Sequence, residues 1–122
     1  MRALRAELPV IFGADPAAIR GGDWGEMRAL MLSLPAGTDL TPLLSGLPNG
    51  LCPCPHWGYL LRGQVRVTYA DSQETLNTGD LFYLPPGHTA FVEEDAEIIE
   101  FSRPHEHEPV LNVIKRNATE VA

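Results

Sequence analysis

Four residues combine types and a spacing that suit metal chemistry: Cys52, Cys54 and His56 alternate within Cys-Pro-Cys-Pro-His, and His88 follows later in the chain. Alternate side chains of an extended segment point to the same face, and the intervening prolines favour an extended backbone. Three donors on one face could therefore converge on an ion. Because alternate residues lie about 6.5 to 7 Å apart along a strand, all three could share one ion only across a bend or bulge.

Thiolate and imidazole donors together favour Zn²⁺ or Fe²⁺ over Mg²⁺ or Ca²⁺. Four such ligands close a tetrahedral site, whereas three leave a position for water or substrate. Both donor types must lose a proton before they bind. More than one proton is therefore expected to accompany metal binding or release in weakly acidic solution.

Two metal-free interpretations of these residues stay open. Free cysteines are often small buried hydrophobes, and His56 and His88 could be hydrogen-bonded residues of a pocket wall in a binding or sensory module. The same two histidines could instead be catalytic, as acid and base, because the ordinary pKa of histidine is near 6.5.

The remaining candidate residues are expected to have structural roles. His105 and His107, in Pro-His-Glu-His-Glu-Pro, are predicted to lie in a solvated tail. Asp80 is expected to order a turn, and residues 93–95 to form a solvated loop, because nothing nearby would desolvate one of their carboxylates. Side chains with the opposite strand parity from His56 are expected to pack or to form a subunit contact: Trp57, Tyr59 and Leu61.

Short segments of alternating or apolar residues between turn-forming residues predict an all-β chain, folded as a sandwich or barrel. Two short stretches, 15–20 and 40–44, are predicted as minor helical turns, the first because Asp15 can cap and Pro16 suits the first helical position. Gly79 and Gly87 are expected in turns that need a positive φ or a close approach. The predicted strands cover residues 27–34, 63–69, 74–77, 81–84, 89–92, 97–101 and 110–114.

Length and composition fit one globular domain over residues 1–122, with a flexible tail after about residue 117. The net charge of −7 repels phosphate backbones and anionic lipid head groups, so neither nucleic acid nor a membrane is an expected partner. No apolar run approaches the roughly 18 residues that cross a bilayer, and residues 1–10 do not form the apolar core of a signal peptide. A cytoplasmic protein with free thiols is expected, because an extended Cys-Pro-Cys is poor geometry for a disulfide.

Two longer stretches resemble the two sequence motifs of the cupin family. The first is Cys-Pro-Cys-Pro-His-Trp-Gly-Tyr-Leu-Leu-Arg-Gly at residues 52–63, and the second is Gly-Asp-Leu-Phe-Tyr-Leu-Pro-Pro-Gly-His at residues 79–88. With the strands between them, the likeness covers about residues 34–101. The first motif also resembles that of a subgroup of small cupin-domain proteins. The resemblance implies one jelly-roll domain, a fold that carries many functions.

The cupin pattern has His-x-His, then Glu, then a final His, and none of these four residues is in its expected place here. Counted from the motif glycines, His56 stands where the glutamate belongs and Cys52 where the second histidine belongs, while Gly50 and Ala90 occupy the other two positions. In the implied jelly roll the two motif strands approach each other inside the barrel. That approach would bring His88 within reach of the other candidate ligands.

We therefore predict a metal-binding cupin-like protein with a small-molecule pocket, in which Cys52, His56 and His88 hold Zn²⁺ or Fe²⁺. Cys54 is expected as a fourth ligand or in contact with the ligands. If the protein is an enzyme, the expected chemistry is of the oxygenase, isomerase or lyase type on a small organic substrate. The resemblance also implies a homodimer, with the apolar stretch 8–12 as a candidate exchanged or edge strand.

Overall fold

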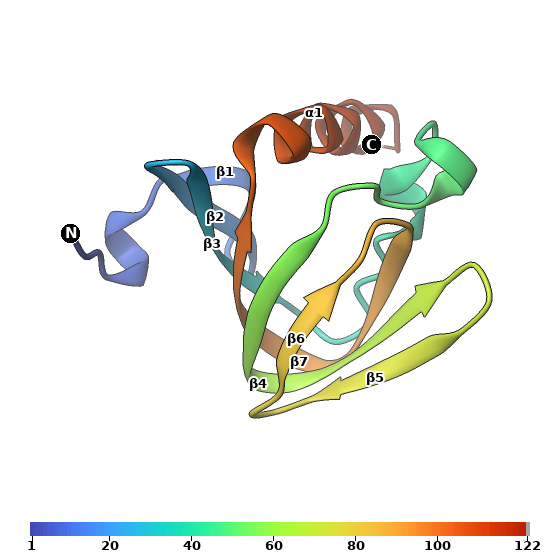
Figure 1. Cartoon of the computed structure of the whole chain (residues 1–122), viewed down its shortest axis with the longest axis horizontal. Coiled ribbons are helices and arrows are strands. Elements are labelled where there is room, and N and C mark those ends of the chain that lie inside the picture. The colour runs from blue at the N-terminus through green and yellow to red at the C-terminus, as the bar shows by residue number, and fades with distance from the viewer. Residues whose placement is uncertain (122) are drawn as a thin grey trace.

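The computed structural model describes residues 1–121 and contains, within that range, one curved antiparallel sheet of seven strands and a C-terminal helix (Figure 1). The strand order is β1-β2-β3-β7-β4-β5, and β6 also pairs with β4. The strands are β1 (Val10–Ala14), β2 (Ala17–Trp24), β3 (Met27–Leu34), β4 (His56–Tyr69), β5 (Gln73–Asn77), β6 (Leu81–Leu84) and β7 (His88–Ser102). Helix α1 spans Pro104–Val121, and short 3₁₀ turns span η1 (Arg5–Glu7), η2 (Thr41–Leu44) and η3 (Pro48–Gly50).

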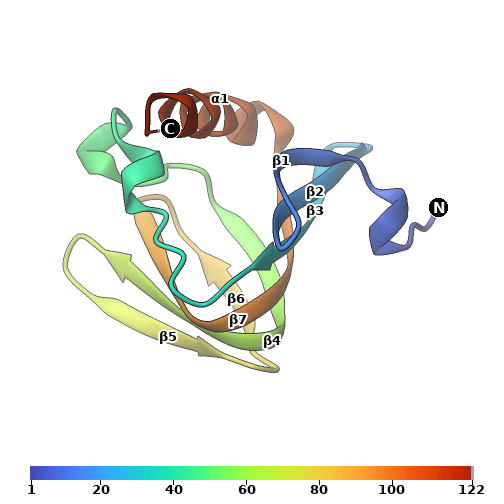
Figure 2. The ribbon, with the colours of Figure 1, turned by 180° about the vertical axis from the view of Figure 1, so that it is seen from behind.

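Strands β4 and β7 are the two longest and run side by side through the middle of the sheet (Figures 1 and 2). Their pairing is irregular between Leu60 and Val65, and bulges of this kind bend a sheet. The sheet is curved, and the apolar side chains of β3, β4, β5, β6 and β7 on its inner face form one buried core. Its fully buried side chains include Leu30, Leu60, Val67 and Val92. This is the all-β sandwich or barrel that the alternation in the sequence predicts.

The strand predictions are confirmed for 27–34 and 81–84, and 63–69 and 74–77 lie within β4 and β5. The stretch 8–12 overlaps β1, which is an edge strand of the sheet. Residues 93–95, predicted as a loop, are solvent-exposed but belong to β7, which joins the predicted strands 89–92 and 97–101 into one. The 40–44 turn is confirmed as η2.

The predicted helical turn at 15–20 is wrong. Asp15-Pro16 forms the turn of a hairpin between β1 and β2, in which Ala14 pairs with Ala17. The cap and proline signals suit a hairpin turn equally well. Pairing of β2 with strands on both sides satisfies its backbone groups, which one short helical turn would leave open.

The predicted strand at 110–114 is also wrong, because these residues lie in the middle of α1. The apolar residues that suggested a strand have helical spacing when taken with His107, since Val110, Leu111 and Ile114 follow it by three, four and seven positions. Pro104 suits the first helical turn. The helix continues through residues 117–121, where a flexible tail was expected, and lies across one end of the curved sheet (Figures 1 and 2).

Within residues 1–121, no helix is long and apolar enough to cross a membrane.

Candidate metal centre and pocket

The backbone brings the two sequence motifs together through one pair of residues. Cys52 and His88 form an isolated antiparallel bridge, in which the Cys52 N–H donates to the His88 carbonyl at 2.8 Å. The Gly87 N–H donates back to the Cys52 carbonyl at 2.8 Å. Gly87 has a φ of +93°, a conformation that suits glycine, and β7 begins immediately after it. The Pro-Pro-Gly turn therefore sets His88 beside Cys52.

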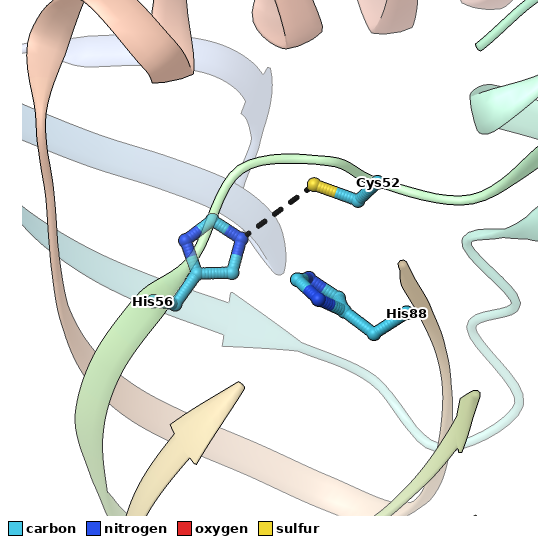
Figure 3. Close-up of side chains that lie close together, drawn as sticks. All are labelled: Cys52, His56 and His88. Atoms are coloured by element: carbon cyan, nitrogen blue, oxygen red, sulfur yellow. Dashed lines mark hydrogen bonds between the residues drawn. The ribbon is translucent and has the colours of Figure 1, made fainter. Parts of the chain in front are cut away.

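Three of the four predicted ligands converge. One ligand atom from each of Cys52, His56 and His88 lies within 4.8 Å of the other two, and all three side chains are buried. The Sγ of Cys52 is 3.8 Å from Nε2 of His56, and the rings of the two histidines are 5.0 Å apart at an edge-on angle. Figure 3 shows the three side chains pointing toward one another, with Cys52 and His56 on the segment that leads into β4 and His88 at the start of β7.

The other ring nitrogen of each histidine is held by a protein oxygen. Nδ1 of His88 lies 2.8 Å from the Pro85 carbonyl, which can only accept, so this nitrogen carries the proton. Nδ1 of His56 lies 2.6 Å from the Ser102 hydroxyl. Metal-binding histidines usually donate their second N–H to such a partner, which leaves Nε2 with a free lone pair for the ion.

Burial keeps the three candidate ligands uncharged when no metal is bound. It lowers the pKa of His56 to about 4 and, helped by the neighbouring His56, that of His88 to about 4. It raises the pKa of the Cys52 thiol to about 12, although a hydrogen bond to the Cys54 backbone opposes the rise. Both imidazoles are thus ready to bind a cation at neutral pH, whereas the thiol must first lose its proton.

The spacing fits a tetrahedral metal site. With Zn–N near 2.0 to 2.1 Å and Zn–S near 2.3 Å, ligand atoms of a tetrahedral site are separated by roughly 3.3 to 3.7 Å. The spread of 4.8 Å in the cluster therefore needs side-chain movements of only about 1 Å. Three protein ligands leave one position for water or a substrate atom.

Cys54 is buried but lies outside this cluster. Its Sγ is 3.5 Å from the Pro55 carbonyl, and the side chain packs with Cys52, Leu44 and Val110 between the barrel and α1. Burial raises the pKa of the Cys54 thiol to about 11, while a hydrogen bond with Ser102 opposes that rise. Ser102 therefore contacts both Cys54 and His56, so that Cys54 touches the candidate centre through this hydroxyl.

The cluster opens into a cavity of about 90 Å³ inside the barrel. Its walls are mainly leucine, isoleucine and valine side chains from the inner face of the sheet. The polar groups among its lining residues are the three clustered side chains together with Thr89, Glu100 and His107. A cavity of this size holds several waters or a small organic molecule.

Sequence reasoning missed Glu100, which lines the cavity at one end. Its carboxylate lies 3.8 Å from Nδ1 of His56 and is buried, which raises its pKa to about 7 although the nearby imidazole of His88 opposes the rise. A parity signal was present, because Ala96, Ile98, Glu100 and Ser102 alternate along β7 and all four are buried. A carboxylate at an alternate position among apolar residues of a strand is therefore as good a candidate for a site residue as a histidine.

His107 corrects the prediction of a solvated tail. It lies on α1, is only 7% exposed, and its ring is 6.2 Å from that of His56. His105, on the other face of the helix, is exposed as predicted. The helical spacing of His107 with Val110, Leu111 and Ile114 is the signal that would have predicted a buried position for it.

The other assignments fall where the sequence indicated. The Asp80 carboxylate accepts from the Asn77 N–H at 2.7 Å and so orders its turn. Trp57, Tyr59 and Leu61 point away from the cavity, and Tyr59 and Leu61 are exposed. Gly79 and Gly87 both have positive φ angles, of +94° and +93°.

Comparison with known proteins shows what this arrangement is similar to. Residues 55–98 match the model of the AraC-like ligand binding domain. No curated protein sequence matches the chain. Among solved structures, an RmlC-like cupin from Shewanella frigidimarina has a TM-score of 0.60 at 16% identity, covering 84% of this chain and 88% of its own.

KdgF from a Halomonas species has a TM-score of 0.60 at 19% identity, with 83% of this chain and 92% of that chain covered. Bacillus subtilis oxalate decarboxylase, described with Mn(II) centres, has a TM-score of 0.54 at 20% identity over 71% of this chain and 25% of that chain. The fold is therefore the cupin jelly roll, as the two motifs implied.

Proposed function

We propose that this chain is a metal-binding cupin with an enclosed small-molecule pocket, in which Cys52, His56 and His88 hold Zn²⁺ or Fe²⁺. The observation that carries the proposal is the convergence of these three side chains within 4.8 Å at the polar end of an apolar cavity. The contact of His88 Nδ1 with the Pro85 carbonyl supports it, because it leaves Nε2 free to bind, and the Ser102 hydroxyl can accept from Nδ1 of His56 in the same way. Cys54 acts beside the ligands through Ser102.

The metal assignment follows from the donor set. Oxalate decarboxylase of the same fold has Mn(II) centres, which shows that this barrel can hold a metal in another protein. A thiolate with two imidazoles suits Zn²⁺ or Fe²⁺ better than Mn²⁺, which prefers oxygen ligands. The departure from the cupin ligand pattern thus changes the favoured ion.

In the enzymatic form of this proposal, the bound metal would polarise an oxygen of a small substrate at its open position. The chain's own residues would do the rest. The apolar walls exclude water, and the buried carboxyl of Glu100 holds a proton up to about pH 7, where it can give or take one beside the bound molecule. Oxygenase, isomerase and lyase reactions are all compatible with this arrangement.

A metal-free binding or sensory module is the second candidate, and the match to the AraC-like ligand binding domain favours it. In that case the pocket alone would bind the small molecule. The acid–base alternative for His56 and His88 has less support, because a pKa of about 4 lies far from the neutral range in which a histidine catalyst works best.

Elemental analysis tests the main proposal. The protein, expressed under reducing conditions with zinc and iron supplied and purified without a histidine tag, should contain close to one equivalent of metal. His56→Ala, His88→Ala and Cys52→Ser should each lose most of it, whereas Cys54→Ser should retain part. His105→Ala removes an exposed histidine and serves as the matched control. A metal-free parent protein would leave the binding module as the better account.

We also propose that the chain forms a homodimer through the outer face of β4, β6 and β7, and that it works in the cytoplasm. Trp57 pairs with Tyr83 and Phe101 on this face, and Tyr59 pairs with Leu81, whose side chain is 84% exposed. An exposed apolar patch of this kind favours a protein contact. Light scattering should give a dimer that Leu81→Lys converts to monomer, while Gln73→Lys on β5 leaves it intact; a monomeric parent protein would contradict this.

A further inference from the structure

His107 is a buried polar residue for which the metal proposal has no use. It lines the cavity from α1, on a segment that belongs to neither sequence motif. Its Nδ1 lies 3.0 Å from a guanidinium nitrogen of Arg28 on β3. The same guanidinium forms ion pairs with Asp23 and Glu108, at 2.7 and 2.8 Å, which hold it in place.

Arg28 determines where the proton of His107 lies. A guanidinium can only donate hydrogen bonds, so Nδ1 of His107 must accept and its proton must lie on Nε2. The ring is uncharged, because burial, His56 and the charge of Arg28 together lower its pKa to about 4. His107 therefore offers one N–H donor on the side of the ring that faces away from Arg28.

This tautomer separates His107 from the metal ligands. A protonated Nε2 has no lone pair for an ion, and Nδ1 is already used by Arg28. His107 is also too far from Cys52, His56 and His88 to belong to the group of side chains whose ligand atoms converge. The ring therefore keeps one N–H group that can donate a hydrogen bond, on a residue that lines the cavity.

We infer that His107 is a specificity-determining residue, whose Nε2–H donates to the carbonyl oxygen of a small, uncharged and mostly apolar ligand in the barrel cavity. The inference names the ligand class for the pocket of the proposed function and rests on that pocket, not on the metal. It would therefore survive a finding that the protein binds no ion.

The cavity itself limits the ligand. Its volume of about 90 Å³ is smaller than the roughly 150 Å³ cavity that admits benzene, which leaves room for about five non-hydrogen atoms. Its lining residues include no lysine or arginine to neutralise an anion, and they do include the carboxyl of Glu100. A neutral carbonyl compound with a short hydrocarbon chain fits these conditions better than a carboxylate does.

The test uses metal-free protein and two probes of matched shape. Butanone carries the carbonyl oxygen, and 2-methyl-1-butene replaces that oxygen with a methylene group. Nitrogen NMR of the histidine rings should show His107 with its proton on Nε2, and butanone should shift the His107 Nε2–H signal. Because a hydrogen bond contributes about 0.5 to 1.5 kcal/mol, butanone should bind to the parent protein about 2- to 12-fold more tightly than to His107→Leu.

Matched variants separate recognition from packing. His107→Gln keeps a donor close to the Nε2 position and should retain a preference for butanone over the alkene, whereas His107→Leu should bind both probes alike. His105→Leu, at an exposed position of the same helix, should behave as the parent protein. Three results would each overturn the inference: a proton on Nδ1 of His107, no response of its Nε2–H to butanone, or an unchanged butanone preference in His107→Leu.

Discussion

The Ser102 hydroxyl lies 2.6 Å from Nδ1 of His56, and so joins the last residue of β7 to the first residue of β4 behind the candidate metal centre. Ser102 is fully buried, and its hydroxyl also opposes the rise that burial causes in the pKa of the Cys54 thiol. If the hydroxyl accepts from His56 and donates to Cys54, the Nε2 lone pair of His56 points toward Cys52. One hydroxyl thus links Cys54 to the orientation of a ligand.

Replacing Ser102 with alanine should weaken zinc binding about 10- to 100-fold, because the loss of such a partner frees the ring of a metal-binding histidine. Competition with a coloured zinc chelator measures the change. Ser72→Ala, at an exposed turn position, is the matched control and should bind as the parent does. Unchanged affinity in Ser102→Ala would mean that His56 is oriented by other contacts.

The metal-free protein should lose stability on acidification. The pKa values of His56, His88 and His107 are lowered from 6.5 to about 4 in the folded protein. Between about pH 6.5 and pH 4 the unfolded chain therefore binds more protons than the folded chain, and the free energy of unfolding falls as the pH falls. Glu100 acts in the opposite direction, because its raised pKa lets the folded protein hold a proton up to about pH 7.

From these shifts, each of the three histidines should lower the free energy of unfolding by about 2 kcal/mol between pH 7 and pH 5. Glu100 should raise it by about 2 kcal/mol over the same range, which offsets the effect of one histidine. Urea denaturation at the two pH values measures the net loss. His105→Ala should follow the parent curve, since its side chain is exposed in the native protein. Equal stability at both pH values would contradict the burial of neutral imidazoles.

Zinc binding at neutral pH should release close to one proton. Ordinary pKa values would make histidine and cysteine both compete with the ion, which predicts more than one. Burial changes that expectation, because both histidine ligands are already neutral and, of the three ligands, only the Cys52 thiol has an acidic proton to lose, with its pKa raised to about 12.

Calorimetry in buffers of different ionisation enthalpy, at pH 6 and pH 7.5, counts the released protons. Cys52→Ser should reduce the number to near zero and weaken binding, while Cys54→Ser should leave it near one. Release of two protons by the parent protein would place Cys54 among the ligands. No release with full occupancy would mean that oxygen ligands hold the ion.

The turn glycines should be requirements of the backbone. Gly79 and Gly87 have φ angles of +94° and +93°, where an added Cβ is strained even though it meets nothing closer than 4.0 Å. Alanine at either position should lower the free energy of unfolding by about 1 to 2 kcal/mol. Gly22→Ala is the matched control, since its φ is not positive and its added Cβ would make ordinary contacts at 3.7 and 3.8 Å. Equal melting temperatures for Gly79→Ala and Gly22→Ala would contradict this role.

Short apolar stretches between turn residues were sufficient to predict the strands at 27–34 and 81–84, although buried and exposed side chains alternate only in the second, and in the first side chains of both parities are buried. It failed at 110–114, where a helix and a strand place apolar residues at overlapping positions and only the inclusion of His107 separates the two periods. Convergence of Cys52 with His88 depends on a backbone bridge between distant segments, which spacing alone does not encode. Glu100 and His107 belong to the pocket for the same reason, since their neighbours come from other parts of the sequence.

Helix α1 has a further consequence for the timing of binding. It contributes His107, Val110 and Ile114 to the cavity wall, and it is fastened to η2 by Asn117, whose amide donates to the carbonyls of Leu43 and Ser45 at 2.7 and 2.8 Å. Arg28 fastens the other end through Glu108 and His107. A molecule that enters past α1 can do so only when one of these sets of hydrogen bonds breaks. Asn117→Ala should therefore raise both the association and the dissociation rate of a ligand and change its affinity much less. The helix would then act on residence time, a property that neither the ligand set nor the cavity determines.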